Sequence, residues 1–162
     1  MEPELIESLP LGRSLSLLAK TYFGTLTKRL EHLEIERHYS VLIFLEQAGN
    51  SCTQQTICDA LRIDKVSMVR MLDHLGDKKY LKKTVNPTDR REHMIELTPK
   101  GKNALPEIYA AMKSLNKEAF KGLTKENQKD FYKWISIIQS NLDPLPSQKI
   151  YMNFKKANRD KK

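Results

Sequence analysis

Two short helical segments followed at once by two strand-like segments constrain the fold more than any other feature of this chain. Thr53 and Asp64 are each placed to cap a helix, the first over 54–61 and the second beginning KVSMVRMLDHL, because their side-chain oxygens accept from free backbone amides. The spacing i, i+3, i+4 and i+7 predicts the buried face of the second helix as Met68, Met71, Leu72 and Leu75. Small α proteins contain many such pairs. The two helices alone therefore support a DNA-binding helix-turn-helix and an ordinary helix pair equally.

The segments LKKTV at 81–85 and HMIEL at 93–97 each alternate apolar and polar side chains, and Asn86-Pro87 marks a turn between them. This pattern predicts a β-hairpin with a charged tip. A helix-turn-helix followed by a hairpin is the winged-helix arrangement, in which one helix enters the major groove and the wing reaches an adjacent minor groove. The hairpin therefore favours the DNA-binding interpretation of the two helices.

The stretch DRREHMIELTPKGK resembles the wing signature of the multiple-antibiotic-resistance regulator (MarR) family of bacterial transcription factors, which runs Asp-x-Arg, an alternating strand, Leu-Thr and then Gly. The matching positions are Asp89, Arg91, Leu97, Thr98 and Gly101. The resemblance spans roughly residues 11 to 142 and is sharpest over 53–101. It implies a winged helix-turn-helix homodimer, joined by its N- and C-terminal helices, that binds a pseudo-palindromic DNA operator and regulates transcription, with repression the expected mode.

Two positions depart from the family pattern. Where the family has Gly before the first wing strand, this chain has Lys79, and Gly76 lies three residues earlier. The helix therefore either ends sooner or places Lys79 in a strained backbone conformation. The polar residue that commonly precedes the recognition arginine is Val69 here, which suggests an apolar contact with a thymine methyl group.

The remaining segments are helical by their apolar spacing. A long N-terminal helix, which Gly24 is expected to interrupt, carries a stripe of Leu11, Leu15, Leu18, Tyr22, Leu26, Leu30 and Leu33. A buried helix ends at Gly49-Asn50, and Thr98 opens another that Pro106 is expected either to kink or to adjust in its first turns. The last helix is expected to direct Leu123, Phe131, Trp134, Ile135, Ile138 and Leu142 inward.

The expected fold class is mainly α with a small two-stranded β-wing, a winged helix-turn-helix plus N- and C-terminal dimerisation helices. The expected divisions are a dimerisation helix at 1–34, the DNA-binding lobe at 35–100, C-terminal helices of the dimerisation region at 101–143 and a basic tail at 144–162. A frayed end is expected for that tail.

The charge balance indicates the kind of partner. Lysine and arginine number 28 against 20 aspartate and glutamate, giving a net charge of +8, which suits a nucleic acid first and an anionic membrane second. The excess is uneven, because residues 103–162 hold twelve basic and six acidic side chains. The longest apolar run, VLIFL at 41–45, is too short to cross a bilayer. The start MEPELIESLP does not resemble a secretory signal, so the expected location is the cytoplasm.

Arg70 on the outward face of the second helix is the best candidate for direct base readout, since a guanidinium binds guanine O6 and N7 together; a phosphate contact is an equal alternative. Resemblance to the family favours Arg91 as the minor-groove residue over the alternative that Arg91 is only a structural partner of Asp89. Asp89 is expected to hold the wing in one conformation. The full set of expected DNA-binding residues is Lys65, Val66, Ser67, Val69, Arg70, Lys82, Lys83, Arg90 and Arg91. In this set Lys82, Lys83 and Arg90 supply sequence-independent attraction to phosphates.

The resemblance also implies a pocket between the dimerisation region and the DNA-binding lobe for a small, often aromatic or phenolic, effector. Candidates near that pocket are Tyr22, His38, Tyr39 and Tyr109, each at least as well explained as a core residue.

Other classes of function find little support in the sequence. Cys58 is expected in the core and Cys52 to be more exposed, and no basic residue adjoins Cys52 to activate it as a sensor. The four histidines lack the spacing of a zinc motif, and there is no Gly-rich phosphate loop or nucleophile elbow. No metal, cofactor or catalytic site is therefore expected. The alternative that stays open is a winged-helix module that binds a protein partner instead of DNA.

Overall fold

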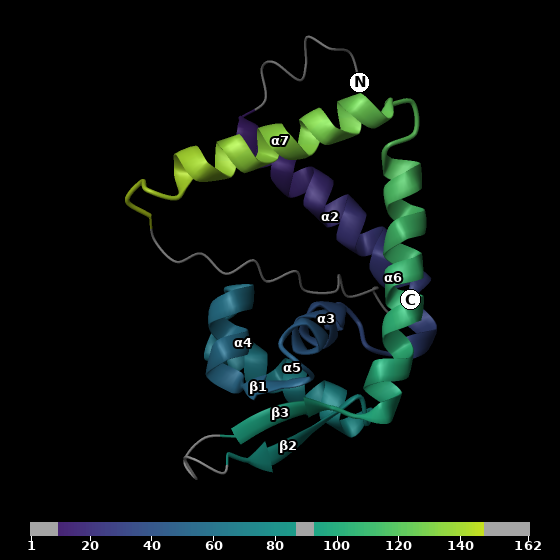
Figure 1. Ribbon diagram of the computed structural model, residues 1–162, viewed down its shortest axis with the longest axis vertical. Coiled ribbons are helices and arrows are strands. Elements are labelled where there is room, and N and C mark those ends of the chain that lie inside the picture. The colour runs from purple at the N-terminus through teal and green to yellow at the C-terminus, as the bar shows by residue number, and fades with distance from the viewer. Residues whose placement is uncertain (1–9, 87–92, 148–162) are drawn as a thin grey trace, which may run out of the picture.

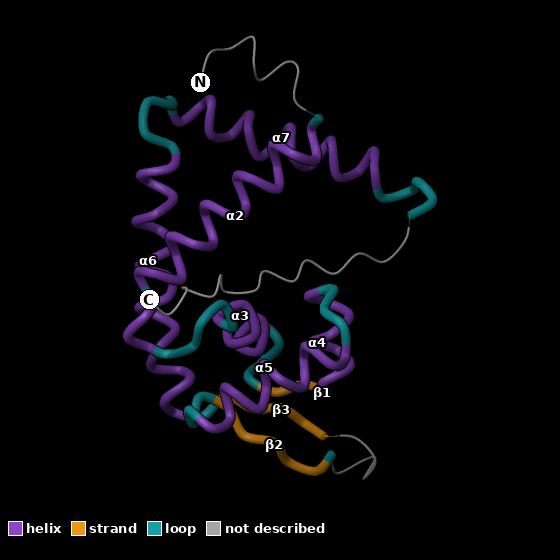
Figure 2. The backbone as a smooth tube through the Cα atoms, turned by 180° about the vertical axis from the view of Figure 1, so that it is seen from behind, coloured by secondary structure: helices purple, strands orange, loops and turns teal. Residues whose placement is uncertain are grey.

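The computed structural model describes residues 10–86 and 93–147, which form helices around a small sheet (Figure 1). The helices are α2 (Leu11–Arg29), the short 3-10 helix η1 (Glu31–Leu33), α3 (Tyr39–Gln47), α4 (Gln54–Leu61), α5 (Lys65–Asp77), α6 (Pro99–Ala119) and α7 (Lys125–Leu142). The strands are β1 (Ser51–Thr53), β2 (Leu81–Val85) and β3 (His93–Leu97). Helices α3, α4 and α5 and the sheet make one lobe, and α2 and α6 lead away from it towards α7 at the opposite end (Figures 1 and 2).

Helix α3 lies in the middle of the core, as its apolar sequence predicts. Tyr39, Val41, Leu42 and Leu45 are buried, and the helix ends where Gly49 and Asn50 both take positive φ angles, 78° and 73°. The largest fully buried side chains around it are Leu26, Leu30, Ile35, Leu42, Leu45, Ile57, Met68, Leu72, Leu75, Ile95, Leu105 and Ile108. The core therefore joins the base of α2 and the first half of α6 to the lobe.

The sheet has three strands, where the sequence predicts two. The strand order is β1-β3-β2, and β1 is antiparallel to β3 with Cys52 opposite Ile95. The prediction missed β1 because three residues are too few to establish an alternation of apolar and polar side chains. The expected exposure of Cys52 is also wrong, because pairing in β1 buries it. Cys58 is buried as predicted, and burial raises the pKa of both thiols.

Helix α2 is continuous through Gly24, so the predicted interruption is wrong. A single glycine costs a helix only about 1 kcal/mol, which a helix of 19 residues tolerates. Only its lower half joins the core: Leu26 is buried, whereas Leu11, Leu15 and Leu18 are 53%, 45% and 56% exposed.

Helices α6 and α7 form the rest of the chain's upper end. Thr98 caps α6 as predicted, and α6 passes through Pro106 as one helix (Figure 1). The prediction that α7 directs its apolar side chains inward is wrong for the single chain, because α7 has no buried residue. Trp134 and Leu142 are 56% and 50% exposed, since no other described element covers this face.

Candidate nucleic-acid interface

The helix-turn-helix is held at each helix start by the predicted cap. The amide of Thr56 donates to Thr53 Oγ1 at 3.2 Å, and the amide of Ser67 donates to Asp64 Oδ1 at 2.8 Å. The hydrogen bonds from Ser67 hold the pKa of Asp64 below its usual range, so the capping carboxylate stays charged. Between the helices, Arg62 adopts a φ of 50° at the C-cap of α4, and the chain turns there into α5.

The outward face of α5 presents two valines and two cations. Val66 and Val69 are 63% and 39% exposed, Lys65 and Arg70 are exposed, and Ser67 is half-buried. The opposite face buries Met68, Leu72 and Leu75 completely and Met71 in part. Exposed valines at helical spacing beside a guanidinium suit the edges of bases, where thymine methyl groups and guanine acceptors lie together.

Lys79, which stands where the family has glycine, lies just beyond the C-terminal end of α5. The helix ends at Asp77, and Lys79 takes a φ of 62°, so it occupies the strained left-handed conformation. The amide of Lys79 donates to the Gly76 carbonyl at 2.8 Å, and the amide of Tyr80 donates to the Leu75 carbonyl at 2.9 Å. This pair of bonds is a Schellman ending, in which glycine is the usual residue.

The start of α6 is fastened to this same end of α5. Thr98 Oγ1 donates to the Lys79 carbonyl at 2.7 Å, and the Thr98 amide donates to the Tyr80 carbonyl at 3.1 Å. A Cβ added to Gly101 would lie 2.2 Å from the Tyr80 carbonyl oxygen. The Leu-Thr-x-x-Gly part of the wing signature is therefore a joint in which only a residue without a side chain fits at Gly101.

The end of η1 and the turn after it are hydrogen-bonded to the C-terminal end of α5. His74 Nε2 donates to the Glu34 carbonyl at 2.7 Å, Lys78 Nζ lies 2.8 Å from Glu34 Oε2, and the Tyr80 hydroxyl donates to the Leu33 carbonyl at 2.9 Å. The hydrogen bond from Lys78 holds the pKa of Glu34 low. Sequence reasoning missed Glu34, because nothing local marks contacts that join residues 40 or more positions apart.

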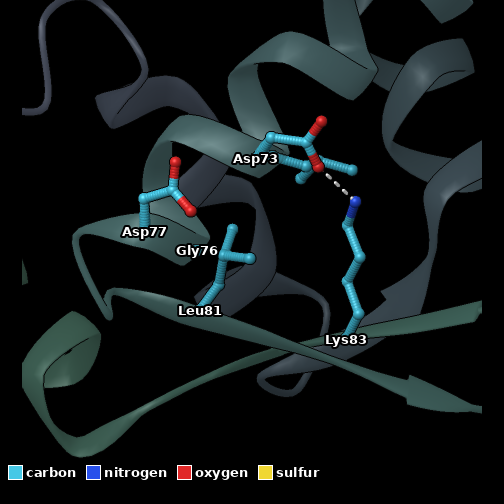
Figure 3. A pocket seen from close by; sticks show the side chains of 6 residues that line it. Asp73, Gly76, Asp77, Leu81 and Lys83 are labelled. Atoms are coloured by element: carbon cyan, nitrogen blue, oxygen red, sulfur yellow. Dashed lines mark hydrogen bonds and ion pairs between the residues drawn. The ribbon is translucent and has the colours of Figure 1, made fainter.

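The two wing lysines predicted to attract phosphates are each paired within the chain. Lys82 Nζ lies 2.8 Å from Glu96 Oε2, and Lys83 Nζ lies 2.6 Å from Asp73 Oδ1 on α5 (Figure 3). Lys82 and then Thr84 hold the pKa of Glu96 low by hydrogen bonding. The Lys83 pair crosses a shallow groove of about 190 Å³ between α5 and β2. Asp89, Arg90 and Arg91, the predicted tip residues, lie outside the described residues.

A second groove, of about 310 Å³, runs beside the outward face of α5. Its lining residues are Glu36, His38, Ser67, Arg70, Met71 and His74. The rings of His38 and His74 meet edge to face with centroids 5.2 Å apart. Burial, and then the proximity of His74, lowers the pKa of His38 to about 4. His38 Nδ1 is buried and has no hydrogen-bond partner among the residues that the structure describes.

The other three predicted effector residues lie elsewhere. Tyr39 is buried in the core, and burial raises its pKa to about 12. Tyr22 donates to Asn116 Oδ1 at 2.7 Å, and Tyr109 donates to Glu46, which raises the pKa of Tyr109 to about 12. Of the four candidates only His38 lines a described groove.

Within residues 10–86 and 93–147, no three His, Cys, Asp or Glu side chains are grouped so that they could hold a metal ion. Nor does any helix of the same part of the chain have the length and apolar character to cross a membrane.

Comparison with known proteins agrees with the lobe described above, because residues 35–92 match the model of the MarR family. The lobe of residues 35–92 is therefore of MarR-family type, and the chain as a whole has a MarR-like fold. Its fold is similar to that of a MarR transcriptional regulator from Methanosarcina mazei Go1, with a TM-score of 0.75, 21% identity, and coverage of 83% of this chain and 98% of that one.

Two similar MarR-family structures contain DNA. A mutant MarR from E. coli was crystallised with operator DNA; its TM-score is 0.73, its identity 24%, and the match covers 82% of this chain and 95% of that one. A regulator from Listeria monocytogenes was crystallised with a 26mer DNA, at a TM-score of 0.74 and 18% identity, covering 83% and 89%. MarR-family proteins are DNA-binding regulators and not enzymes, so the family assignment agrees with the expectation that the chain lacks a catalytic site.

Proposed function

We propose that this MarR-family chain is a homodimer that binds a pseudo-palindromic DNA operator through α5 and the wing and represses transcription there. The observation that carries the proposal is the exposed face of α5, with Val66, Val69 and Arg70 held outward by a helix that is fastened at both ends. The E. coli and Listeria proteins of similar fold were crystallised with DNA, which supports the same partner for this chain.

Each element has a distinct role in the proposal. Arg70 reads a guanine, Val66 and Val69 contact thymine methyl groups, and Lys65 and Ser67 meet phosphates at the start of α5. The resemblance of the wing assigns Arg91 to a narrow minor groove and Asp89 to its support, and Arg90 adds attraction to phosphates. Lys82 and Lys83 join them by exchanging Glu96 and Asp73 for phosphate oxygens, at some cost in free energy because each carboxylate loses its partner.

Homodimerisation is supported by the apolar surface that the single chain leaves open. Leu11, Leu15 and Leu18 on α2 and Trp134 and Ile135 on α7 are all more than 40% exposed, and both helices reach the end of the molecule away from the wing (Figure 1). Monomeric soluble proteins rarely expose apolar patches of such extent. A second copy that covers both helices would present two recognition helices to successive major grooves, one helical turn of roughly 34–36 Å apart.

The proposal includes a small aromatic or phenolic effector and a cytoplasmic location. The groove beside His38 has the position that such regulation requires, because it is lined by Ser67, Arg70, Met71 and His74 of the recognition helix. An effector acts only through its different affinity for the DNA-bound and free states. Occupation of this groove would alter the surroundings of Arg70 directly.

Selection of bound sequences from a random DNA pool tests the proposal. We expect a two-fold symmetric sequence to emerge, with half-sites separated by about one helical turn. The pool should be selected in parallel with Arg70→Ala, which should lose the preference at one base pair in each half-site. A pool that stays random with the wild-type chain would refute sequence-specific binding.

The internal pairing of Lys82 and Lys83 favours one other candidate, a winged-helix module that binds a protein partner. Because both lysines are paired with carboxylates, the lobe has fewer free cations for DNA phosphates than the sequence suggests. Salt dependence separates the two functions, because a duplex-binding dimer loses affinity steeply as salt rises. Binding to duplex that is weak at low salt and unchanged by added salt would favour the protein partner.

A further inference from the structure

Six lysines recur at intervals of four residues where α6 gives way to α7. They are Lys113, Lys117, Lys121, Lys125, Lys129 and Lys133, which we name the lysine ladder. The first two lie on α6, Lys121 lies in the connection and the last three lie on α7. All six are exposed.

The ladder has no ion-pair partner in the part of the chain that the structure describes. Within residues 10–86 and 93–147, none of the six lysines lies within 4.0 Å of a carboxylate oxygen, whereas Lys78, Lys82 and Lys83 in the lobe are all paired. The neighbouring Glu118 is taken by Arg29 of α2. Like charges at i and i+4 destabilise a helix, so the isolated chain gains nothing from this spacing. Such an arrangement becomes favourable when a polyanion lies against it.

The ladder faces away from the surfaces that pack. On α7, the 3.6-residue period places Lys125, Lys129 and Lys133 on the side opposite Phe131, Trp134 and Ile135. The same period on α6 places Lys113 and Lys117 opposite the buried positions Ala104, Leu105, Ile108 and Leu115. A second copy of the chain that covers the apolar side of α7 therefore leaves the ladder in solvent.

The ladder also lies far from the outward face of α5 that carries Val66, Val69 and Arg70, which we name the recognition face. Helix α7 and the end of α6 are at one end of the molecule, and the β2–β3 hairpin is at the other (Figures 1 and 2). A straight duplex that contacts α5 and the wing does not pass both ends. The ladder is therefore available to a different polyanion while the recognition face is occupied.

We propose that the lysine ladder binds the phosphate backbone of a second DNA duplex, without sequence preference, so that one dimer bridges two duplex segments. The inference rests on the proposed function for the first duplex. An anionic membrane is disfavoured, because a helix lying on a bilayer buries its apolar face there, and in the dimer a partner chain covers that face of α7. An acidic protein is disfavoured, because lysine is depleted from the core of protein interfaces.

Energy transfer between two labelled duplexes tests the bridge. Donor- and acceptor-labelled copies of the selected operator are mixed with the full chain at low salt, and we expect transfer in the presence of wild-type protein. Lys125→Gln/Lys129→Gln/Lys133→Gln should lose most of this transfer while keeping its operator affinity. The salt slope for the second duplex should fall by about 2.7, since each phosphate contact contributes about 0.9.

A matched control removes the same charge elsewhere. Arg13→Gln/Lys20→Gln/Lys28→Gln takes three cations from exposed positions on α2 and should keep the transfer. A second ladder variant, Lys113→Gln/Lys117→Gln on α6, guards against a defect in α7, and it should also reduce transfer. The mass of every variant in solution is compared with that of the wild type, so that loss of the dimer is not mistaken for loss of the ladder.

Three results would overturn the proposal. The first is intact operator binding without transfer, which would leave the proposed function standing. The second is transfer that survives in both ladder variants. The third is ladder-dependent binding to vesicles of anionic phospholipid with no transfer between duplexes, which would identify lipid phosphate as the polyanion. Failure of the wild-type chain to bind any duplex would instead refute the proposed function itself.

Discussion

Replacing Gly101 with alanine should destabilise the chain, because the joint between α5 and α6 has no space for a Cβ. The added atom would lie 2.2 Å from the Tyr80 carbonyl oxygen and 3.1 Å from Leu97 Cδ2. Reaching an ordinary contact requires α6 and Tyr80 to separate by about 1 Å. That shift stretches the hydrogen bonds that Thr98 makes to the Tyr80 carbonyl, both at 3.1 Å, and to the Lys79 carbonyl, at 2.7 Å.

The magnitude follows from these bonds. Three hydrogen bonds of about 1 kcal/mol each are weakened or lost, and the better helix propensity of alanine returns up to about 1 kcal/mol. The expected loss is therefore about 2–3 kcal/mol in the free energy of unfolding, within the range of other overpacked sites. Urea unfolding measures it, at one fixed protein concentration because a dimer's apparent stability depends on concentration.

Gly24 supplies the matched control. It lies within α2, and a Cβ there would have nothing within 4 Å, so Gly24→Ala should raise the free energy of unfolding by up to about 1 kcal/mol. The two substitutions are chemically identical and should have opposite signs. If Gly101→Ala were as stable as the wild type, Gly101 would not lie this close to Tyr80 in solution. The described contact between the end of α5 and the start of α6 would then be refuted.

Three further substitutions test the recognition helix and its surroundings. Arg70→Ala should cost about 1–3 kcal/mol on the selected operator and less on random duplex, by anisotropy titration; equal losses on both would mean a phosphate contact. Lys79→Gly should raise the free energy of unfolding by up to about 1 kcal/mol, because glycine adopts φ near 62° without strain. The pKa of His38 is depressed from 6.5 to about 4, so the unfolded chain binds more protons than the folded chain between these pH values. The contribution of neutral His38 to the free energy of unfolding is therefore complete above pH 6.5 and is lost as the pH falls towards 4. Wild type should therefore lose about 2 kcal/mol more than His38→Leu between pH 7 and pH 5; equal losses would exclude a buried neutral imidazole.

Local chemistry explains why much of the lobe could be predicted from the sequence. Thr53, Asp64 and Thr98 each have a cap that depends only on residues within one turn of the chain. The buried face of α5 follows from spacing, because a helix with one apolar stripe has one way to face a core. The outward position of Arg70 then follows without knowledge of any other element.

Contacts between distant segments set the limit of prediction. Strand β1 has only three residues and exists because β3 offers an edge, so no pattern within 51–53 announces it. The pairs Asp73–Lys83 and Glu96–Lys82 depend on register and on the angle between α5 and the sheet. Sequence reasoning therefore counted both lysines as free.

The apolar stripes of α2 and α7 illustrate a different limit. Periodicity identifies one apolar face on each helix, but it cannot say whether this chain or another covers that face. Leu18 and Trp134 have the same spacing signal as Leu26, yet Leu26 is fully buried and the other two are 56% exposed. In the single chain the same pattern marks a core at Leu26 and an open face at Leu18 and Trp134, where we propose an interface between copies.

The contacts around α5 indicate which elements control its orientation. The 31–36 turn holds it through the Glu34 carbonyl, and the start of α6 holds it through the carbonyls of Lys79 and Tyr80. The bond from the Thr98 amide to the Tyr80 carbonyl joins backbone atoms at both ends, so rotation of a side chain cannot release it. By contrast, the hairpin's ion pair to α5 joins Lys83 and Asp73, which are 37% and 55% exposed, and such surface pairs contribute at most about 1 kcal/mol. Since α2 leads directly into the turn and α6 begins at the joint, the angle of α5 follows the two helices that lead to the proposed dimer interface more closely than it follows the wing.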